Sequence, residues 1–231
     1  MQNGILISLP IMLLLKTKIP NYSSIKNIIF DFGGVVCDLD IQRSVEKFKE
    51  FGPGKSIKNE TQEEKDRQFE MLVSKYETGL ITSGKFRNNI REYYQTPPSD
   101  TAIDDAWNAL LVGIPEPRMM LLESIKKNYR IFLLSNSNEI HYLEYTARLR
   151  QQYGYHDFSV IFKKTYFSYQ CHLKKPDPLI FKLVLNENNL DPSVTLFIDD
   201  TQVNVKTACD LGLTGYQLRD GEEITDLFYT P

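Results

Sequence analysis

The stretch that decides the fold is Lys26-Asn-Ile-Ile-Phe-Asp-Phe-Gly-Gly-Val-Val36. Within it, Ile28-Ile-Phe30 is a short apolar run rich in β-branched residues, which predicts a buried strand. Asp31 follows at the carboxyl end of this run, and the glycine pair at 33–34 breaks the strand. A charge buried there costs free energy unless it has a partner. In an open parallel sheet this position is the mouth of the active-site crevice, so Asp31 is either a reactive group or a turn-capping residue.

Composition limits the class of protein to which the chain can belong. The chain has 231 residues, of which 42% are hydrophobic and 25% are charged, and its net charge is -3. Such a chain can bury one sizeable core plus a smaller second unit. It lacks the excess positive charge that nucleic acid or an anionic membrane attracts, so we expect neither partner. Attraction of an anionic substrate must then be local, from a metal ion, a lysine or a helix N-terminus.

Cysteine and histidine usage argues against zinc and against disulfides. The chain has three cysteines and three histidines, none of them at the spacing of metal ligands. An odd, sparse cysteine count is typical of a reducing compartment, so we expect a cytoplasmic protein. His172 is interpreted as a surface or loop residue and not as an acid catalyst.

The N-terminal segment contains an apolar run at residues 4–15. This run is too short to span a bilayer, which takes about 20 apolar residues. It also lacks the positive start and the Ala-x-Ala cleavage site of a secretory signal. We therefore treat residues 1–24 as an N-terminal extension, for which Met12 is an alternative start to Met1, and leave it out of the fold prediction.

Residues 38–113 carry helical patterns and no convincing strand. The first of these patterns predicts a helix over 38–51, with Val45 and Phe48 on one face. Further apolar residues recur at helical spacing as far as Trp107, and glycine or proline clusters separate the segments. We expect a compact helical insertion here.

After residue 113 the pattern becomes an alternation of strands and helices. Arg130–Ser135 and Val194–Ile198 are continuous apolar strands, and Lys164–Ser168 and Gly215–Leu218 are weaker ones. This alternation predicts a Rossmann-like α/β fold, a doubly wound parallel sheet covered by helices on both faces. The predicted division is an N-terminal extension at 1–24, a core domain at 25–37 and 114–231, and an all-helical cap domain at 38–113.

Polar residues end three of the predicted strands: Asp31, Ser135 and the pair Asp199-Asp200. In a right-handed parallel sheet these carboxyl ends lie on one edge. Lys175 stands just before a predicted helix start, where the chain returns to that edge. Carboxylate oxygens are the ligands that Mg²⁺ prefers. A metal cation, a lysine and a serine together can bind the negative oxygens of a phosphoryl group. Asp31 would then be free to act as nucleophile. Taken singly, Lys175 could be a solvated lysine, and Ser135 and Asp200 could be helix caps.

The order of these residues resembles the haloacid dehalogenase superfamily from about Ile25 to Arg219. Four segments carry the resemblance: Asp31-Phe-Gly-Gly-Val, Leu133-Leu-Ser-Asn136, Lys175-Pro-Asp-Pro-x-x-Phe181 and Phe197-Ile-Asp-Asp-x-x-x-Asn204. The third is typical of the helical-cap phosphatases of that superfamily. Val35–Asp40 and Glu77-Thr-Gly79 are most similar to its glucose-1-phosphatase-like group.

The resemblance implies a mechanism and a role for each motif residue. Asp31 would attack phosphorus and form an aspartyl-phosphate, which water then hydrolyses, with Ser135 and Lys175 as further catalytic residues. The implied metal ligands for Mg²⁺ are Asp31, the backbone carbonyl of Gly33, and Asp200. The implied substrate-binding residues are Ser135, Asn136 and Lys175. The implied supporting residues, which would orient the others, are Asp199 and Asn204.

Gly33 departs from the pattern that the resemblance implies. Phosphatases of the superfamily usually carry a second aspartate two residues after the nucleophile, as general acid and base. Such proton transfer contributes about 10²–10⁴-fold to the rate, so we expect slow turnover or a preference for good leaving groups. The departure also disfavours phosphomutase activity. Asp38 and Asp40 lie nearby in the chain, and we interpret them as turn and capping residues at the hinge of the cap.

Three hypotheses about function follow. The first is a Mg²⁺-dependent phosphatase, a monomer or homodimer, that acts on a small phosphorylated metabolite such as a sugar phosphate. The second is a protein of the same fold that binds phosphometabolites with weak or no turnover, because of Gly33. The third is a haloacid dehalogenase, which would use the same aspartate nucleophile without a metal. The acid pair at 199–200 argues against it, because a dehalogenase gains nothing from a cation site. Under the first hypothesis we expect substrate choice to lie with Glu77–Gly79 and Trp107 on the cap.

Overall fold

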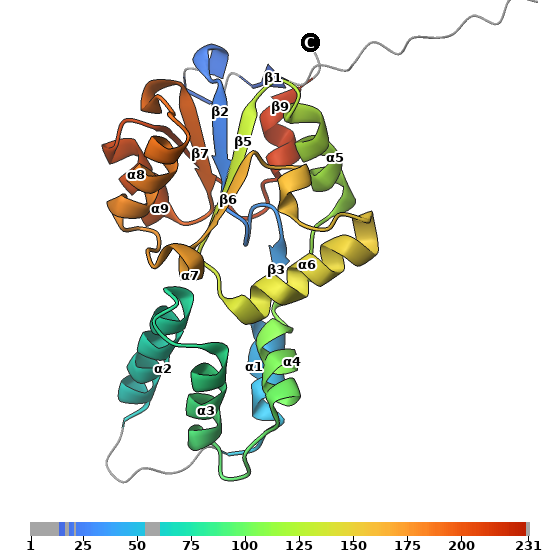
Figure 1. The fold of residues 1–231 in the computed structure, drawn as a ribbon, viewed down its shortest axis with the longest axis vertical. Coiled ribbons are helices and arrows are strands. Elements are labelled where there is room, and N and C mark those ends of the chain that lie inside the picture. Colours follow the sequence, from blue (N-terminus) through green and yellow to red (C-terminus); the bar gives the residue numbers. More distant parts are fainter. Residues whose placement is uncertain (1–13, 17–18, 21, 54–60, 230–231) are drawn as a thin grey trace, which may run out of the picture.

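The computed structural model describes residues 14–16, 19–20, 22–53 and 61–229. In Figure 1 these residues form an α/β core with a group of helices, α1 to α4, at one end. The core contains a five-stranded parallel sheet in the order β6-β5-β2-β7-β8. Its strands are β2 (Asn27–Phe30), β5 (Arg130–Ser135), β6 (Lys164–Phe167), β7 (Thr195–Asp199) and β8 (Thr214–Gln217). The predicted doubly wound parallel sheet is confirmed.

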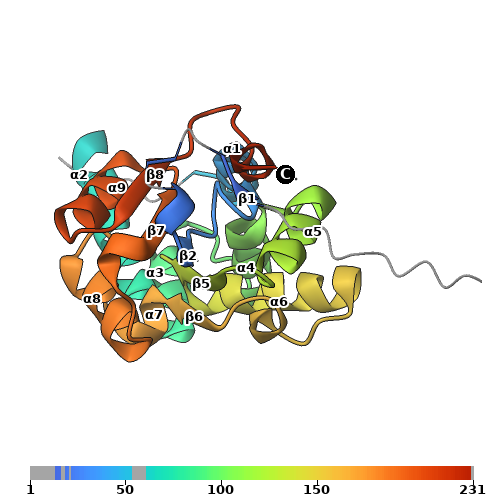
Figure 2. The same cartoon turned by 90° about the horizontal axis from the view of Figure 1, so that it is seen from above.

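Strand β2 is apolar throughout because it lies at the centre of the sheet with both faces covered. Ile28 and Phe30 pack into one hydrophobic cluster and Ile29 into another, and none of the three is exposed. Figure 2 shows the sheet from above, as a layer between two pairs of helices. One pair is α5 (Glu116–Ile125) and α6 (Glu139–Tyr153), and the other is α8 (Pro178–Glu187) and α9 (Gln202–Asp210).

The register of the central strands brings distant parts of the chain to one edge. Phe30 lies opposite Leu133 of β5 and opposite Ile198 of β7. The next residue, Asp31, donates its backbone N–H to the carbonyl of Ile198 at 2.9 Å. Asp199 ends β7 beside it. The strand ends that carry the predicted reactive groups therefore meet at the carboxyl edge of the sheet.

Four helices occupy the end of the molecule next to this edge, in Figure 1 the lower end. Each begins after a polar residue whose side chain accepts a hydrogen bond from a backbone N–H of the first turn, which stabilises helix starts. Their shared core is aromatic and includes Tyr76, Phe86 and Trp107. The helices are α1 (Ile41–Lys49), α2 (Gln62–Glu77), α3 (Ser83–Tyr93) and α4 (Asp100–Asn108).

Two short strands lie where the sequence predicts none. β3 (Asp38–Leu39) and β4 (Leu111–Gly113) pair antiparallel where the chain leaves the core and returns to it. The prediction of a helix from residue 38, and of no strand over 38–113, is wrong at these two places. Strands of two and three residues are too short to show an alternating pattern, so sequence periodicity could not reveal them.

Part of the N-terminal segment also belongs to the folded structure. β1 (Leu14–Leu15) pairs antiparallel with β9 (Phe228–Tyr229), and Ile19 is fully buried in the main cluster. Leaving residues 1–24 out of the fold prediction missed these contacts. Residues 1–13, which hold most of the apolar run, lie outside the described residues. No helix in the described part of the chain combines the length and the apolar character needed to cross a bilayer.

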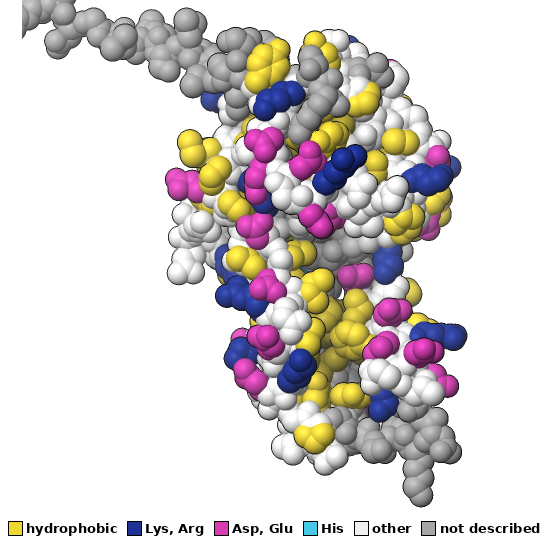
Figure 3. Space-filling view, turned by 180° about the vertical axis from the view of Figure 1, so that it is seen from behind, with side chains coloured by type: hydrophobic (Ala, Val, Ile, Leu, Met, Phe, Trp, Pro, Cys, Tyr) yellow, Lys and Arg dark blue, Asp and Glu magenta, His cyan; other side chains and the backbone are white. Residues whose placement is uncertain are grey.

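Hydrophobic side chains remain exposed on α1 and α2. They include Ile41 and Val45 on α1 and Phe69 and Met71 on α2, each at least 40% exposed. Figure 3 shows the molecule from behind, with a strip of hydrophobic side chains along the helical region between charged ones. The helical region thus presents an apolar surface as well as a buried core.

Phe181→Ala should destabilise the core. The Phe181 side chain is fully buried on α8, and its ring centre lies 5.1 Å from that of Phe197 in an edge-to-face arrangement. The cavity left behind should lower the free energy of unfolding by about 3–5 kcal/mol. Leu179→Ala, an exposed position on the same helix, is the matched control and should change it by less than about 0.5 kcal/mol. Urea unfolding followed by circular dichroism measures both, and equal effects would contradict this packing.

Candidate active site

Asp31 lies buried at the carboxyl edge of the sheet, directly after β2. Its Oδ1 atom accepts a hydrogen bond from the backbone N–H of Phe32 at 2.6 Å. The same oxygen lies 2.7 Å from Nζ of Lys175. Because both contacts use Oδ1, they leave Oδ2 for another partner.

Lys175 connects the ends of two neighbouring strands. Its buried ammonium lies 2.7 Å from Asp31 and 2.7 Å from Oδ2 of Asp199. Its backbone is held by Asn136, whose side-chain amide accepts from the Lys175 N–H and donates to the Lys175 carbonyl, both at 2.9 Å. The lysine is therefore fixed at both its backbone and its charged end. The structure brings together the carboxylates and the amine that the sequence placed at one edge.

Asp199 is fully buried at the end of β7. Besides Lys175, its carboxylate accepts hydrogen bonds from the side chain of Asn204 at 3.1 Å and from the backbone N–H of Thr201 at 2.8 Å. Buried charges are tolerated when they are paired and hydrogen-bonded in this way. Asp199 thus orients Lys175, and Asn204 orients Asp199.

Burial is the largest influence on the pKa values of the ionisable groups at the site, and their charged neighbours are the second. Burial raises the pKa of Asp31 to about 7, although Lys175 opposes the rise, and Asp199 adds to it. Burial and the nearby Asp199 also raise the pKa of Asp200. Burial disfavours the charged form of Lys175, but its two acidic partners outweigh this effect and raise its pKa. The lysine therefore keeps its positive charge between the two carboxylates.

The acid cluster fits a divalent cation. One carboxylate oxygen from each of Asp31, Asp199 and Asp200 lies within 4.8 Å of the others. Oxygen donors without histidine or cysteine are typical of Mg²⁺ sites. Gly34 adjoins this group with a φ of +73°, and an added Cβ there would overlap Oδ2 of Asp200. The missing side chain at Gly34 thus leaves the space that the carboxylate of Asp200 occupies.

Ser135 and Asn136 lie at the end of β5, next to β2 in the sheet. Ser135 is buried, and its hydroxyl makes a long contact of 3.5 Å with the carbonyl of Asn136. Such a weakly engaged hydroxyl can still donate to a ligand. The amide of Asn136, in contrast, is committed to the backbone of Lys175.

Asp38 and Asp40, the two aspartates that closely follow Gly33, are both engaged in contacts away from the position of the missing acid. Asp38 forms an ion pair with Arg118 at 2.8 Å, and Asp40 caps α1 by accepting from the N–H of Gln42. An added Cβ at Gly33 would lie 2.6 Å from the end of the Leu39 side chain. An apolar group therefore stands next to this position, and both aspartates have structural roles.

Sequence reasoning overlooked two residues of this site. Gly34 is required by its positive φ and by its closeness to Asp200, and the double glycine after Asp31 was the available signal. Thr201 donates its backbone N–H to Asp199 and its hydroxyl to Asp200 at 3.1 Å. Nothing in the sequence distinguishes this threonine from an ordinary residue before a helix.

Comparison with known proteins shows the family to which the chain belongs. The model of the haloacid dehalogenase-like hydrolase family matches residues 25–212, which is most of the chain. This chain belongs to the haloacid dehalogenase-like hydrolases. The family assignment makes it an enzyme and agrees with the resemblance of its four motifs.

Individual proteins are also similar to this chain in sequence and structure. A D-ribitol-5-phosphate phosphatase of Bacteroides thetaiotaomicron is 28% identical over 204 residues, covering 86% of this chain and 94% of the relative. A HAD family enzyme of the same organism, solved with magnesium and inorganic phosphate, has a TM-score of 0.76 at 37% identity, covering 89% of this chain and all of that one. A predicted HAD-like hydrolase from Porphyromonas gingivalis has a TM-score of 0.73 at 30% identity, with 86% and 93% covered.

A haloacid dehalogenase from Xanthobacter autotrophicus is a more distant neighbour. Its TM-score is 0.54 at 17% identity, covering 84% of this chain and 77% of that one. This likeness shows a shared fold and carries no information about the substrate.

Gly34→Ala should weaken Mg²⁺ binding. The new Cβ would push the Asp200 carboxylate away, and displacing groups around a metal site typically costs about 10–100-fold in affinity. Gly154→Ala is the matched control, because Gly154 has the same φ of 73° and an added Cβ there meets nothing within 4 Å. Isothermal titration calorimetry with Mg²⁺ measures both variants. If both bound Mg²⁺ equally well, Gly34 would have no steric role at this site.

Proposed function

We propose that this hydrolase is a Mg²⁺-dependent phosphatase that transfers the phosphoryl group of a small metabolite to Asp31 and then to water. The observation that carries the proposal is the bridge of Lys175 between Asp31 and Asp199, at 2.7 Å to each. It places a cation beside a carboxylate nucleophile, where a phosphoryl group brings further negative charge. Electrostatic stabilisation of this kind is usually the largest contribution to phosphoryl transfer.

The reaction proceeds in two displacements at phosphorus. Oδ2 of Asp31, which its protein contacts leave open, attacks phosphorus, and the bond to the leaving oxygen breaks with its electron pair on that oxygen. A water molecule then attacks the phosphorus of the aspartyl-phosphate. Inorganic phosphate leaves, and the carboxylate of Asp31 is regenerated.

Residues around Asp31 hold the phosphoryl group in line. Lys175 offsets the charge between nucleophile and phosphate, and the hydroxyl of Ser135 donates to a phosphoryl oxygen. Asn136 acts on the substrate through the backbone of Lys175, which it holds from both sides. Asp199 and Asn204 keep the lysine in place.

Asp31, Asp200 and the backbone carbonyl of Gly33 are the groups that would hold Mg²⁺. When bound, the ion supplies positive charge to the phosphoryl oxygens. Burial, and after it the nearby Asp199, raises the pKa values of Asp31 and Asp200, and a cation held between these two carboxyls would favour their charged forms.

The substrate class that we favour is a sugar or polyol phosphate. Support comes from the similarity to the D-ribitol-5-phosphate phosphatase and to the enzyme solved with magnesium and inorganic phosphate. We further propose that residues 38–113 act as a cap over residues 25–37 and 114–231. In that role the turn at Glu77–Gly79 would border the non-phosphate part of the substrate, and closure would exclude water from the first displacement. The expected part of Trp107 in substrate choice is not supported, because its side chain is buried in the aromatic core of the helical region and donates to Asn138 at 3.3 Å.

A second candidate is a binding protein with little or no turnover. Gly33 supports it, because the site lacks a carboxylate there and Leu39 lies against this position. Loss of general acid catalysis lowers rates by about 10²–10⁴-fold, most for substrates with basic leaving groups. A panel of aryl and alkyl phosphates with Mg²⁺ separates the two candidates: turnover well above background for any member removes the binding-protein reading.

Asp31→Asn should abolish hydrolysis of p-nitrophenyl phosphate. Without the carboxylate no aspartyl-phosphate forms, and removal of a nucleophile typically lowers kcat by more than about a thousandfold. Asp210→Asn, which breaks an exposed ion pair with Lys206 on α9, is the matched control and should keep wild-type activity. Chelation by EDTA should stop the wild type, and added Mg²⁺ should restore it.

Two outcomes would contradict this assignment. An Asp31→Asn variant as active as the control would show that another group attacks phosphorus. Chloride release from a chlorinated carboxylic acid that survives EDTA would instead indicate dehalogenase chemistry.

A further inference from the structure

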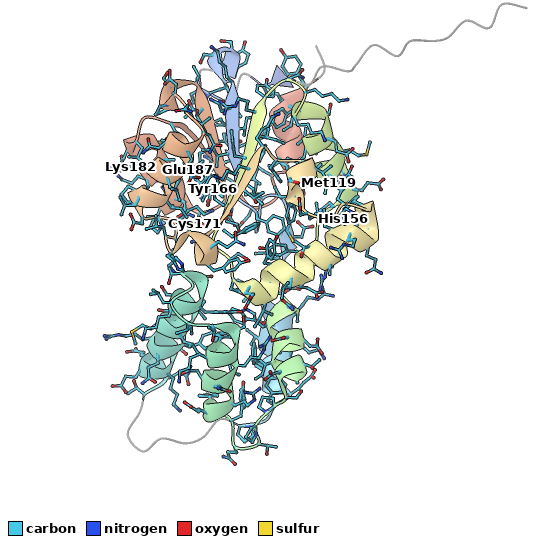
Figure 4. The ribbon with its side chains drawn as sticks, in the orientation of Figure 1. Met119, His156, Tyr166, Cys171, Lys182 and Glu187 are labelled. Atoms are coloured by element: carbon cyan, nitrogen blue, oxygen red, sulfur yellow. The ribbon has the colours of Figure 1, made fainter. Side chains whose placement is uncertain are left out.

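The turn after α2 contacts the segment that leads into Lys175. In Figure 4 the label Cys171 marks the end of α7 (Ser168–Cys171), at the edge of the core next to the helical region. Beyond it, Nδ1 of His172 donates to the backbone carbonyl of Thr78 at 2.9 Å. Lys174 forms an ion pair with Glu77 at 3.2 Å. The helical region therefore touches the residue directly before Lys175.

Gly79 brings the same turn even closer to the core. Its φ is +65°, and an added Cβ would overlap the backbone carbonyl oxygen of Tyr169. The same Cβ would lie 3.1 Å from the ring of His172. Side-chain and backbone contacts thus hold the turn at Glu77–Gly79 against residues 169–174, and we refer to this turn as the α2 clamp.

The segment that the α2 clamp contacts ends at Lys175, which is held at both its backbone and its ammonium group. The Lys175 backbone is held on the core side by Asn136, and its ammonium reaches Asp31 and Asp199. Lys174, one residue earlier, is partly exposed and forms an ion pair with Glu77. A shift of the segment before Lys175 is therefore resisted from opposite sides, by the core and by the helical region.

We infer that the α2 clamp positions Lys175, so that the lysine is correctly placed when the helical region is docked on the core. This inference rests on the proposed function, in which Lys175 offsets charge between Asp31 and the phosphoryl group. Glu77 and Lys174 are positioning residues and touch no reacting atom. A displacement of about 1 Å at a reacting centre costs about 10²-fold in rate, whereas a partly exposed ion pair contributes little to stability.

The kinetic test uses Glu77→Gln and Lys174→Met with p-nitrophenyl phosphate at saturating Mg²⁺. Each change should lower kcat about tenfold and leave KM within about twofold, because the lysine is misplaced while the site remains open to substrate. The double variant should be no slower than either single one. The charge reversal Glu77→Lys with Lys174→Glu should recover most of the activity. Lys206→Met, which removes an exposed ion pair on α9, is the matched control and should leave kcat unchanged.

A Lys175→Ala background separates positioning from a general effect on closure or folding. Without the lysine there is nothing left to position, so Glu77→Gln should cause no further loss in residual activity. An equal loss in both backgrounds would overturn the inference. So would single variants with wild-type kcat.

Amide hydrogen exchange tests the clamp without relying on activity. In the metal-free protein, Glu77→Gln should speed exchange over residues 172–177 and leave the β6 amides unchanged, whereas Lys206→Met should change neither. Unchanged exchange over 172–177 would overturn the inference. If the wild type hydrolyses no phosphate ester but exchange responds as expected, the proposed function fails and the clamp stands.

Discussion

A buried lysine between two carboxylates is the interaction on which the rest of this structure depends. Three aspartates place oxygens within 4.8 Å of one another, and Lys175 supplies one positive charge to them. The remaining excess is two negative charges, which a divalent cation offsets. Burial raises the pKa values of Asp31 and Asp200, and the nearby Asp199 adds to the rise. The cluster therefore has the charge and the oxygen donors that the proposed Mg²⁺ site requires.

The fold serves this cluster by joining chain segments that are far apart in sequence. The parallel register puts Asp31 beside the end of β7, and the neighbouring strand β5 ends at Ser135. Lys175 arrives from a different connection, after β6 and α7, and is held there by Asn136. The same connection is contacted by the helical region. Site and helical region are thus coupled through a short piece of backbone.

The central strands and the acid–lysine cluster could be predicted because burial on both faces demands an unbroken apolar run. β2 and β7 show such runs, and the polar residues that end them stand out by contrast. The pairing of β3 with β4 could not be predicted, since it depends on the return of a distant segment and involves too few residues for a pattern. The burial of Ile19 and the steric fit of Gly34 to Asp200 arise from tertiary contacts that no local pattern encodes. The two hydrogen bonds between the side-chain amide of Asn136 and the backbone of Lys175 are tertiary contacts of the same kind.

In the proposed function, this cluster of acids and lysine holds Mg²⁺ and a phosphoryl group together against Asp31. The most direct measurement is a crystal structure of the protein with Mg²⁺ and beryllium fluoride, a mimic of the phosphoryl group on an aspartate. We expect beryllium bonded to a carboxylate oxygen of Asp31, the metal in contact with Asp31 and Asp200, and the ammonium of Lys175 facing the fluorides. Beryllium fluoride bound elsewhere, or a metal that does not contact Asp200, would contradict it.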